Sequence, residues 1–425
     1  MERTHLSARV DAQGFVTVEK QQKPHVSDKK HACRACGHGP LEPVLSLGDQ
    51  YLVRFTDAPD MSLPRSPLDL VRCSECGLLQ LAHTVSPELL YDQFWYQSSI
   101  NTSMRDALKD VVRTGLKYHH GGTWLDIGAN DGYLLTEVPH SFRRIACEPA
   151  KNFTEKLEEI ADDVIPTYFS ADHECLYRGR LSPGHGGCDV ITSAAMFYDL
   201  DDPNQFVADI VRALSPDGVW INQLNDSPTM LKRNAFDALC HEHLCYYDVH
   251  SLAALYKRHG LSIIEITYNE VNGGSIRVVA EKPGLKTRSI VLADHPRPHQ
   301  DECLKFAARV SKWKDVFSEL VAGPISERGH AWLYGASTKG CVLLQYLDMN
   351  EAFAGIADRN PLKFGKHMSG SWLRIADEGE MRSDRPRNLI VLPWAFRSEF
   401  IERERALLAS GTTMIFPLPN IEMVL

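Results

Sequence analysis

The sequence contains no apolar run that approaches the ~20 residues a helix needs to cross a bilayer, so no membrane partner is expected. It also lacks an excess of basic residues: the net charge is −9, which argues against a nucleic-acid partner. Its first residues are polar and charged and do not resemble a signal peptide, so we expect a cytoplasmic protein. With 425 residues, 44% of them hydrophobic, the composition predicts a soluble protein with more than one domain and small-molecule chemistry.

The eleven cysteines form an odd and scattered set, which does not suit a disulfide framework in a reducing compartment. Four of them form two CxxC pairs, Cys33 with Cys36 and Cys73 with Cys76, and a glycine directly follows each pair. This spacing lets both thiolates of a pair face one ion, and four thiolates complete a closed tetrahedron. The sequence therefore predicts a structural zinc site, with four unrelated buried cysteines as the alternative.

A glycine turn follows the apolar segment at residues 124–127, and its pattern is Asp-x-Gly-x-x-x-Gly. Glycines there let the backbone turn sharply and approach a ligand. The two aspartates of the turn would repel a pyrophosphate but not the cationic methionine end of S-adenosylmethionine. Such a turn also occurs by chance, but an acid about 20 residues further on suits ribose hydroxyls. The residues expected to bind S-adenosylmethionine are Asp126, Gly128, Asn130, Asp131, Gly132 and Glu148.

Apolar segments and helical patterns alternate through residues 124–222, which predicts a parallel α/β sheet with helical crossovers. A second strand-turn-helix unit at residues 331–340 carries Ser337 and Lys339 in place of acids, so its helix N-terminus could hold a phosphate or be a plain structural turn. A further strand ends beside Arg359, at an edge where α/β sheets bind ligands. The expected units are a mobile or hairpin N-terminus at 1–30, a zinc domain at 31–95, an α/β domain at 96–283 and a second nucleotide-fold domain at 284–425.

The densest group of ionisable residues is His241-Glu242-His243. We expect this segment to be extended, so that both histidines face the same way. The HExH pattern differs from the HExxH of zinc proteases. We favour general acid/base catalysis for this segment, because histidine titrates near neutral pH. The alternatives are a metal site and a satisfied structural cluster. Further along, the glycines between Asn272 and Ser275 would let a strand pass close to a ligand, and Arg277 could meet a phosphate or pair on the surface.

Taken in order, these motifs resemble the nucleotide-sugar C-methyltransferases of deoxysugar biosynthesis. The resemblance covers nearly the whole chain after residue 30, and its motifs are the four cysteines, 96–99, 125–132, 241–243, 272–275, 334–340 and 358–361. It implies an N-terminal zinc domain, a class I methyltransferase domain with a Rossmann-like sheet, and a second C-terminal Rossmann-like α/β domain. It further implies transfer of a methyl group from S-adenosylmethionine to the carbon beside the ketone of a nucleotide-linked 4-keto-deoxysugar.

By this resemblance His243 removes the proton alpha to the carbonyl, Glu242 orients or binds, Tyr96 lies by the sugar, and the enolate attacks the methyl group. The chain departs from the family at Cys240, where tyrosine is frequent, and at residues 197–200, where a histidine is frequent; Tyr198 could donate a hydrogen bond to the enolate oxygen there. The catalytic candidates are therefore His243, Glu242, His241, Tyr96 and Tyr198. The substrate-binding candidates are Asn272, Ser275, Arg277, Ser337, Lys339 and Arg359.

Two other functions remain open on the sequence. The first is a methyltransferase that acts on oxygen or nitrogen of another small metabolite, which would keep the cofactor residues. The second is a non-catalytic scaffold, against which the intact set of cofactor-binding residues counts. The chain is expected to be a monomer or a homodimer.

Overall fold

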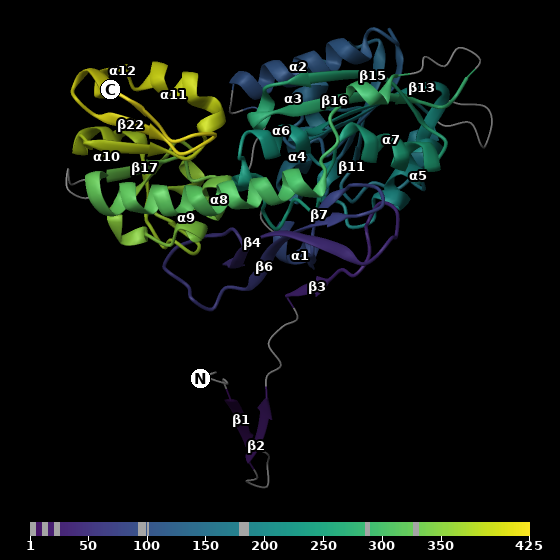
Figure 1. The fold of residues 1–425 in the computed structure, drawn as a ribbon. Coiled ribbons are helices and arrows are strands. Elements are labelled where there is room, and N and C mark those ends of the chain that lie inside the picture. Colours follow the sequence, from purple (N-terminus) through teal and green to yellow (C-terminus); the bar gives the residue numbers. More distant parts are fainter. Residues whose placement is uncertain are drawn as a thin grey trace.

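The computed structural model has three lobes, with a short hairpin standing apart from them (Figure 1). It describes residues 6–10, 16–20, 26–91, 99, 102–177, 187–284, 290–325 and 331–425. The hairpin pairs β1 (Leu6–Val10) with β2 (Val16–Lys20) antiparallel, and the rest of residues 1–25 lies outside the described part. Among the described helices, none has the length and apolar composition to cross a membrane.

The middle lobe is built on a seven-stranded sheet in the order β11-β10-β9-β12-β13-β16-β15. All strands run parallel except β16, which is antiparallel to both neighbours. The parallel pairing expected for residues 124–222 is confirmed. β16 lies beyond that range and runs antiparallel, because the short link from β15 allows only antiparallel pairing. The strands are β9 (Gly122–Ile127), β10 (Phe142–Cys147), β11 (Asp163–Ile165), β12 (Cys188–Ala194), β13 (Leu214–Asn225), β15 (Ser262–Asn269) and β16 (Ser275–Glu281).

Helices cover this sheet and begin at recognisable caps. Asp202 accepts a hydrogen bond from the Gln205 N–H, and a proline occupies the first turn of the helix that follows. Asp248 and Ser251 form a capping box at the start of another. The helices are α2 (Thr102–Gly115), α3 (Tyr133–Thr136), α4 (Thr154–Ile160), α5 (Pro203–Ala213), α6 (Ser227–Lys232) and α7 (Val249–Arg258).

The N-terminal lobe holds a four-stranded antiparallel sheet in the order β14-β7-β6-β4. Its edge strand β14 comes from the middle lobe: Cys245 pairs with Gln80, and Tyr246 with Leu79. The N-terminal lobe is thus joined by backbone hydrogen bonds to a segment far along the chain. The elements are β3 (Ser27–Lys29), β4 (Leu41–Tyr51), β5 (Phe55–Thr56), β6 (Arg65–Cys73), β7 (Leu79–Leu81), β8 (His83–Val85), α1 (Pro87–Tyr91) and β14 (Cys245–Tyr246).

The C-terminal lobe has a six-stranded sheet in the order β20-β18-β17-β21-β22-β23, parallel except for β23. A two-stranded pair of β19 with β5 attaches it to the N-terminal lobe. The strands are β17 (Ala331–Tyr334), β18 (Phe353–Asp358), β19 (His367–Met368), β20 (Ile375–Asp377), β21 (Asn388–Val391), β22 (Thr413–Phe416) and β23 (Glu422–Val424). The helices are α9 (Thr338–Leu347), α10 (Glu378–Asp384), α11 (Arg397–Arg403) and α12 (Arg405–Ala409).

The long helix α8 (Gln300–Leu320) runs across the lobes and touches all three (Figure 1). The Gln300 side chain donates to the Pro43 carbonyl, Arg309 to the Leu231 carbonyl, and the Trp313 indole to the Pro417 carbonyl at 2.7 Å. A π-helical turn, η8 (Val321–Ile325), continues it. Short 3₁₀ turns complete the structure: 151–153, 174–177, 197–199, 236–238, 271–273, 292–294, 350–352, 361–363 and 394–396.

Both α/β sheets reverse their strand order beside their first strand. In the middle lobe β10 lies on one side of β9 and β12 on the other, and in the C-terminal lobe β18 and β21 flank β17 in the same way. The carboxyl ends of strands at such a reversal leave a crevice in which open α/β sheets bind ligands. The fold therefore provides two crevices.

Candidate active site

The four-cysteine cluster predicted from the CxxC pairs is confirmed. The Sγ atom of Cys33 lies 3.6 Å from that of Cys76, close to the ~3.8 Å expected between sulfurs around one tetrahedral zinc ion. Gly37 and Gly77 have φ angles of +74° and +80°, and their N–H groups donate to the carbonyls of the first cysteine of each pair. The ligand atoms that lie within 4.8 Å of one another belong to Cys33, Cys36, Cys73 and Cys76. Four thiolates fill a zinc ion's coordination, so the site is structural.

A cavity of about 380 Å³ opens where the strand order of the middle sheet reverses. Four of the six expected cofactor residues line it: Asp126, Gly128, Asn130 and Glu148. The other two are not in the lining. The buried Asp131 accepts hydrogen bonds from Ser99 and pairs with Lys156 at 3.4 Å, and Gly132 has a φ of +80° at the start of α3. Asp131 and Gly132 therefore shape the loop that carries the lining residues.

Two buried acids line this cavity. Burial raises the pKa of Asp126 to about 7, although the Thr192 hydroxyl donates to its Oδ1 at 2.7 Å. Burial also raises the pKa of Glu148, whose two oxygens accept from the Asn130 and Ala150 N–H groups at 2.8 and 2.9 Å. A bound cation compensates such buried charge. These residues fit S-adenosylmethionine, because it carries a cationic sulfonium and ammonium beside a ribose.

Binding of S-adenosylmethionine should depend on pH through Asp126. Burial raises the pKa of Asp126 to about 7, so below this pH the carboxyl of the empty site is protonated. Binding of a cation beside it must then release the carboxyl proton. We expect about tenfold weaker binding at pH 6 than at pH 8, since each pKa unit corresponds to a factor of ten. Titration calorimetry at both pH values checks this. The Asp126→Asn variant should bind more weakly with a flat profile, and a flat profile in the wild type would contradict the assignment.

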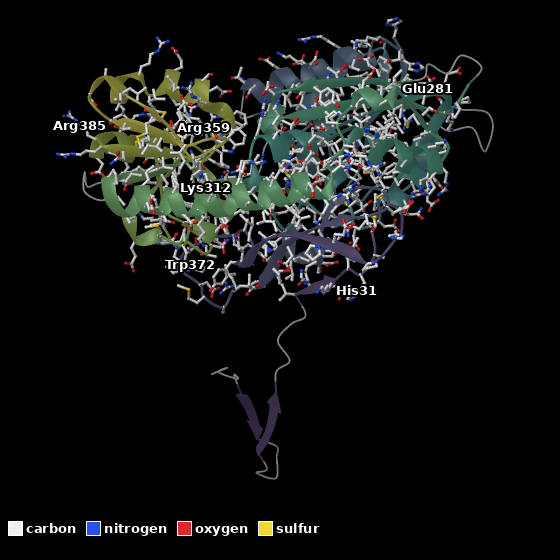
Figure 2. All side chains as sticks on the ribbon, in the orientation of Figure 1. His31, Glu281, Lys312, Arg359, Trp372 and Arg385 are labelled. Carbon is white, nitrogen blue, oxygen red and sulfur yellow. The ribbon has the colours of Figure 1, made fainter. Side chains whose placement is uncertain are left out.

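A second cavity, of about 350 Å³, lies beside the first and is lined by all three lobes. Arg54 comes from the N-terminal lobe, Glu242 and His243 from the middle lobe, and Lys339 and Arg359 from the C-terminal lobe. Figure 2 shows Arg359 on the side of the C-terminal lobe that faces the middle lobe. The two cavities share part of their wall, and the residues common to both are Ala195, Asp199, Asn225 and Asn272.

His243 is held as a neutral base at this second cavity. Its Nδ1 lies 3.0 Å from the Ala238 carbonyl oxygen, which can only accept, so Nδ1 donates and Nε2 carries the free lone pair. Burial lowers the pKa of His243 to about 3, and the charge of Lys339 adds to this effect. The Tyr198 ring packs edge-on against the imidazole, with 4.4 Å between centroids. The fold therefore fixes the ring orientation, the tautomer and the uncharged state.

His241 does not share this environment. The chain turns at this point, with the His243 N–H donating to the Cys240 carbonyl at 3.0 Å, so the expectation of an extended segment with both histidines on one face is wrong. His241 is 3% exposed, its Nε2 lies 2.9 Å from the Ser66 carbonyl, and neither cavity includes it. It packs against the N-terminal lobe. Tyr96, another catalytic candidate, lies outside the described residues.

The substrate-binding candidates divide between the two cavities. Ser337 and Lys339 line the second cavity, where Ser337 caps α9 and the Lys339 ammonium donates to the Asn272 carbonyl at 2.9 Å. Asn272 lines both cavities, and its φ of +55° gives the backbone the turn that puts it there. Ser275 lines only the cofactor cavity. The predicted motifs at 272 and 337–339 thus meet, although they are far apart in the sequence.

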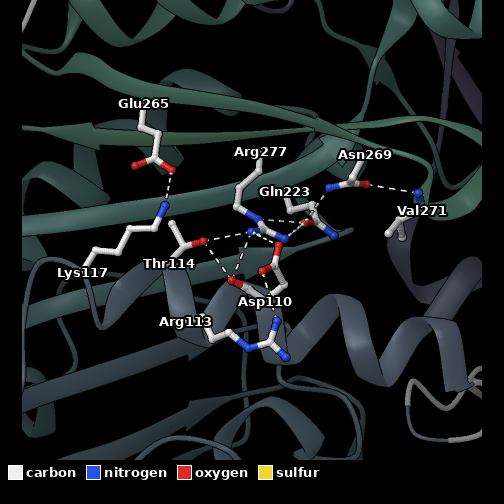
Figure 3. A network of polar contacts seen from close by, with 9 residues as sticks. All are labelled: Asp110, Arg113, Thr114, Lys117, Gln223, Glu265, Asn269, Val271 and Arg277. Atoms are coloured by element: carbon white, nitrogen blue, oxygen red, sulfur yellow. Dashed lines mark hydrogen bonds and ion pairs between the residues drawn. The ribbon is translucent and has the colours of Figure 1, made fainter.

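Arg277 is buried in an internal network instead of reaching either cavity (Figure 3). It is 3% exposed, and its guanidinium donates to Gln223, to Asp110 at 2.7 Å and to the Thr114 hydroxyl at 2.9 Å. These contacts tie α2 to β13 and β16, beside the cofactor cavity. The structure therefore gives Arg277 a supporting place: its guanidinium pairs inside the protein and not on the surface, and it lines neither cavity.

Two acids that the sequence did not single out also line the second cavity. Asp237 is fully buried, accepts from the Trp394 indole at 2.8 Å through Oδ2, and leaves Oδ1 without a hydrogen bond among the described residues. Asp199 likewise has an unpartnered Oδ1. The only sequence signal was their position: Asp199 lies within residues 197–200, and Asp237 lies four residues before His241. Carboxylates in a loop otherwise look like solvated residues.

Comparison with known proteins gives three consecutive family matches. A zinc binding domain matches residues 33–91, a methyltransferase domain matches 96–266, and a C-methyltransferase C-terminal domain matches 270–419. With the class I strand order, the zinc cluster and the cofactor cavity, they define the chain as an S-adenosylmethionine-dependent methyltransferase. More narrowly, it belongs to the C-methyltransferases that combine these three domains.

One relative aligns with nearly the whole chain. The chain is 27% identical over 420 residues to the C-methyltransferase NovU of Streptomyces niveus, covering 92% of this chain and 96% of that protein. Solved structures resemble a smaller part. An S-adenosylmethionine-dependent methyltransferase from Clostridium acetobutylicum has 11% identity and a TM-score of 0.33, covering 42% of this chain and 92% of that one. A Burkholderia thailandensis 1,6-didemethyltoxoflavin-N1-methyltransferase has 12% identity and a TM-score of 0.32, covering 42% and 78%.

Proposed function

We propose that the protein methylates the carbon alpha to the ketone of a nucleotide-linked 4-keto-deoxysugar, through an enolate formed by His243. The observation that supports this most strongly is the wall shared by the two cavities. One cavity carries the acids suited to S-adenosylmethionine, and the other carries the neutral histidine and the cationic residues of the C-terminal lobe. A methyl donor and an acceptor can therefore lie side by side.

The chemistry requires a base at this wall. S-adenosylmethionine supplies an electrophilic methyl group, but an unactivated C–H carbon must lose a proton before it can attack. His243 is uncharged, its Nδ1 is occupied by the Ala238 carbonyl, and its Nε2 can accept that proton. Tyr198 packs against the imidazole and holds its orientation, while Glu242 lies next in sequence on the same cavity. Alignment of donor and acceptor would contribute most of the remaining acceleration.

The lining that the C-terminal lobe gives to the second cavity supports a nucleotide diphosphate as the part of the substrate that is recognised. Lys339 and Arg359 place two cationic side chains there, and Ser337 stands at the N-terminus of α9, where backbone N–H groups favour an anion. Lys363 lines the same cavity. These cationic residues and His243 line one cavity of about 350 Å³, which suits a nucleotide sugar better than a small metabolite without an anionic group.

The test is proton exchange in deuterated water, followed by NMR. Wild-type enzyme is incubated with S-adenosylhomocysteine, which fills the cofactor cavity without a transferable methyl group, and with a panel of nucleotide-linked 4-keto-deoxysugars. We expect one sugar of the panel to lose its alpha-proton signal, and the same sugar without its nucleotide to lose it far more slowly. Methyl transfer without any exchange would instead favour an acceptor oxygen or nitrogen.

A further inference from the structure

Two carboxyl groups line the second cavity, and one of them, Asp199, lies on the wall it shares with the cofactor cavity. Asp199 lines both cavities and Glu242 lines the second. One oxygen of each, Oδ1 of Asp199 and Oε2 of Glu242, is buried and makes no hydrogen bond among the described residues. Buried polar atoms are nearly always paired, so two orphaned oxygens beside His243 indicate a ligand that completes them.

The electrostatic surroundings make it unfavourable for both carboxyls to be ionised. Burial raises the pKa of Asp199 well above its usual range, and repulsion from Glu242 raises it further. Burial also raises the pKa of Glu242, which Arg54 and the Cys240 thiol partly offset. The other groups facing Asp199, the Cys240 thiol and the Tyr246 hydroxyl, are themselves uncharged, because burial raises the pKa of each. Two close carboxyls of this kind hold one proton between them.

We propose that Asp199 is a catalytic residue that donates the shared proton, as a hydrogen bond, to the ketone oxygen of the substrate. This inference rests on the proposed function and adds the group that stabilises the enolate. A carboxylic acid kept neutral in an apolar site can serve as such a donor. We thus place the donor at Asp199, which lines both cavities, and not at Tyr198, which lines only the second.

The electrons then move in two balanced steps. His243 Nε2 takes the alpha proton, the C–H electrons form a carbon–carbon double bond, and the carbonyl π electrons move to the oxygen that Asp199 holds. In the second step the double-bond electrons form the new carbon–carbon bond to the methyl group, the carbonyl re-forms, and the sulfur keeps the electrons of its broken bond to carbon. The proton on His243 leaves to solvent, and Asp199 keeps its own proton throughout.

The experiment compares Asp199→Ala, Asp199→Asn and Tyr198→Phe by the exchange measurement across a range of pH. Loss of one preorganised donor should slow exchange about 10²- to 10³-fold in Asp199→Ala. Asp199→Asn keeps an N–H donor and should stay within about tenfold of the wild type. Wild-type exchange should fall at alkaline pH as the shared proton is lost, and this fall should be absent in Asp199→Asn, whose amide does not titrate. A packing role alone would leave the pH profile unchanged.

Binding of S-adenosylhomocysteine and zinc content show which variants are folded. If Asp199→Asn is as slow as Asp199→Ala, or if its alkaline fall matches the wild type, a neutral donor at this position is refuted. A larger loss in Tyr198→Phe than in Asp199→Ala would transfer the role to Tyr198. These results differ from failure of the proposed function, in which the wild type itself exchanges no alpha proton with any sugar of the panel.

Discussion

His243→Ala should slow alpha-proton exchange by about 10²- to 10⁴-fold, the range that a positioned general base contributes. The alanine removes Nε2, and no other neutral histidine lines the second cavity among the described residues. Burial and the Lys339 charge keep the pKa of His243 near 3, so the loss should be similar throughout the neutral range. Exchange NMR with the substrate identified in the panel measures it.

His241→Asn is the matched control for this change. His241 stands two residues earlier, donates from Nε2 to the Ser66 carbonyl and reaches neither cavity. We expect this variant to lose some thermal stability and to retain far more exchange than His243→Ala. Equal losses in the two variants would show that damage to the loop, and not removal of a base, explains the effect. Unchanged affinity for S-adenosylhomocysteine would show that the cofactor cavity is intact in both.

Cys73→Ser should abolish zinc binding and, with it, methyl transfer. Structural zinc sites bind with apparent free energies of about 10–16 kcal/mol, comparable to the whole stability of a domain. We expect the loss of zinc to disturb the active site through the N-terminal sheet. Strand β7 follows the second CxxC pair and pairs with β14, which begins two residues after His243. Zinc content, the melting temperature and the rate of proton exchange, all measured on one preparation, test whether loss of zinc lowers both stability and activity.

Cys175→Ser provides the comparison for the zinc experiment. This cysteine is half-buried and lies outside the four-sulfur cluster. The variant should keep its zinc, its melting temperature within a few degrees and its exchange rate. A Cys73→Ser protein that loses zinc yet exchanges protons at the wild-type rate would show that the N-terminal lobe does not support the His243 loop.

Local patterns predicted the parts of the site in which neighbours in the sequence act together. The CxxC pairs predicted the zinc cluster because each pair places two sulfurs on one turn. The glycine turn after β9 predicted the cofactor cavity because the loop builds it from its own backbone, although Asp131 and Gly132 support the lining instead of joining it. In both cases the spacing of residues along the sequence determines which groups lie together in the fold.

Residues whose partners lie elsewhere in the chain were harder to place. Arg277 looked like a phosphate ligand, yet its partners Asp110 and Gln223 on other elements use its guanidinium. The reversal of β16 depends on how it pairs with β13, which no local pattern records. Asp199 differs from a solvated aspartate only because the folded chain buries its carboxyl within the electrostatic influence of Glu242. Tertiary contacts, rather than propensity, decide these cases.

The pairing of β7 with β14 also affects how the protein is made. A ribosome produces the zinc-binding cysteines and β7 long before it produces Cys245 and Tyr246, so the edge of β7 stays unpaired through much of synthesis. Open edges attract other strands, and pairing between distant segments is slow. The first lobe therefore cannot finish folding as it emerges. Its last strand arrives together with His243, so the completed zinc lobe and the positioned base appear in one folding event.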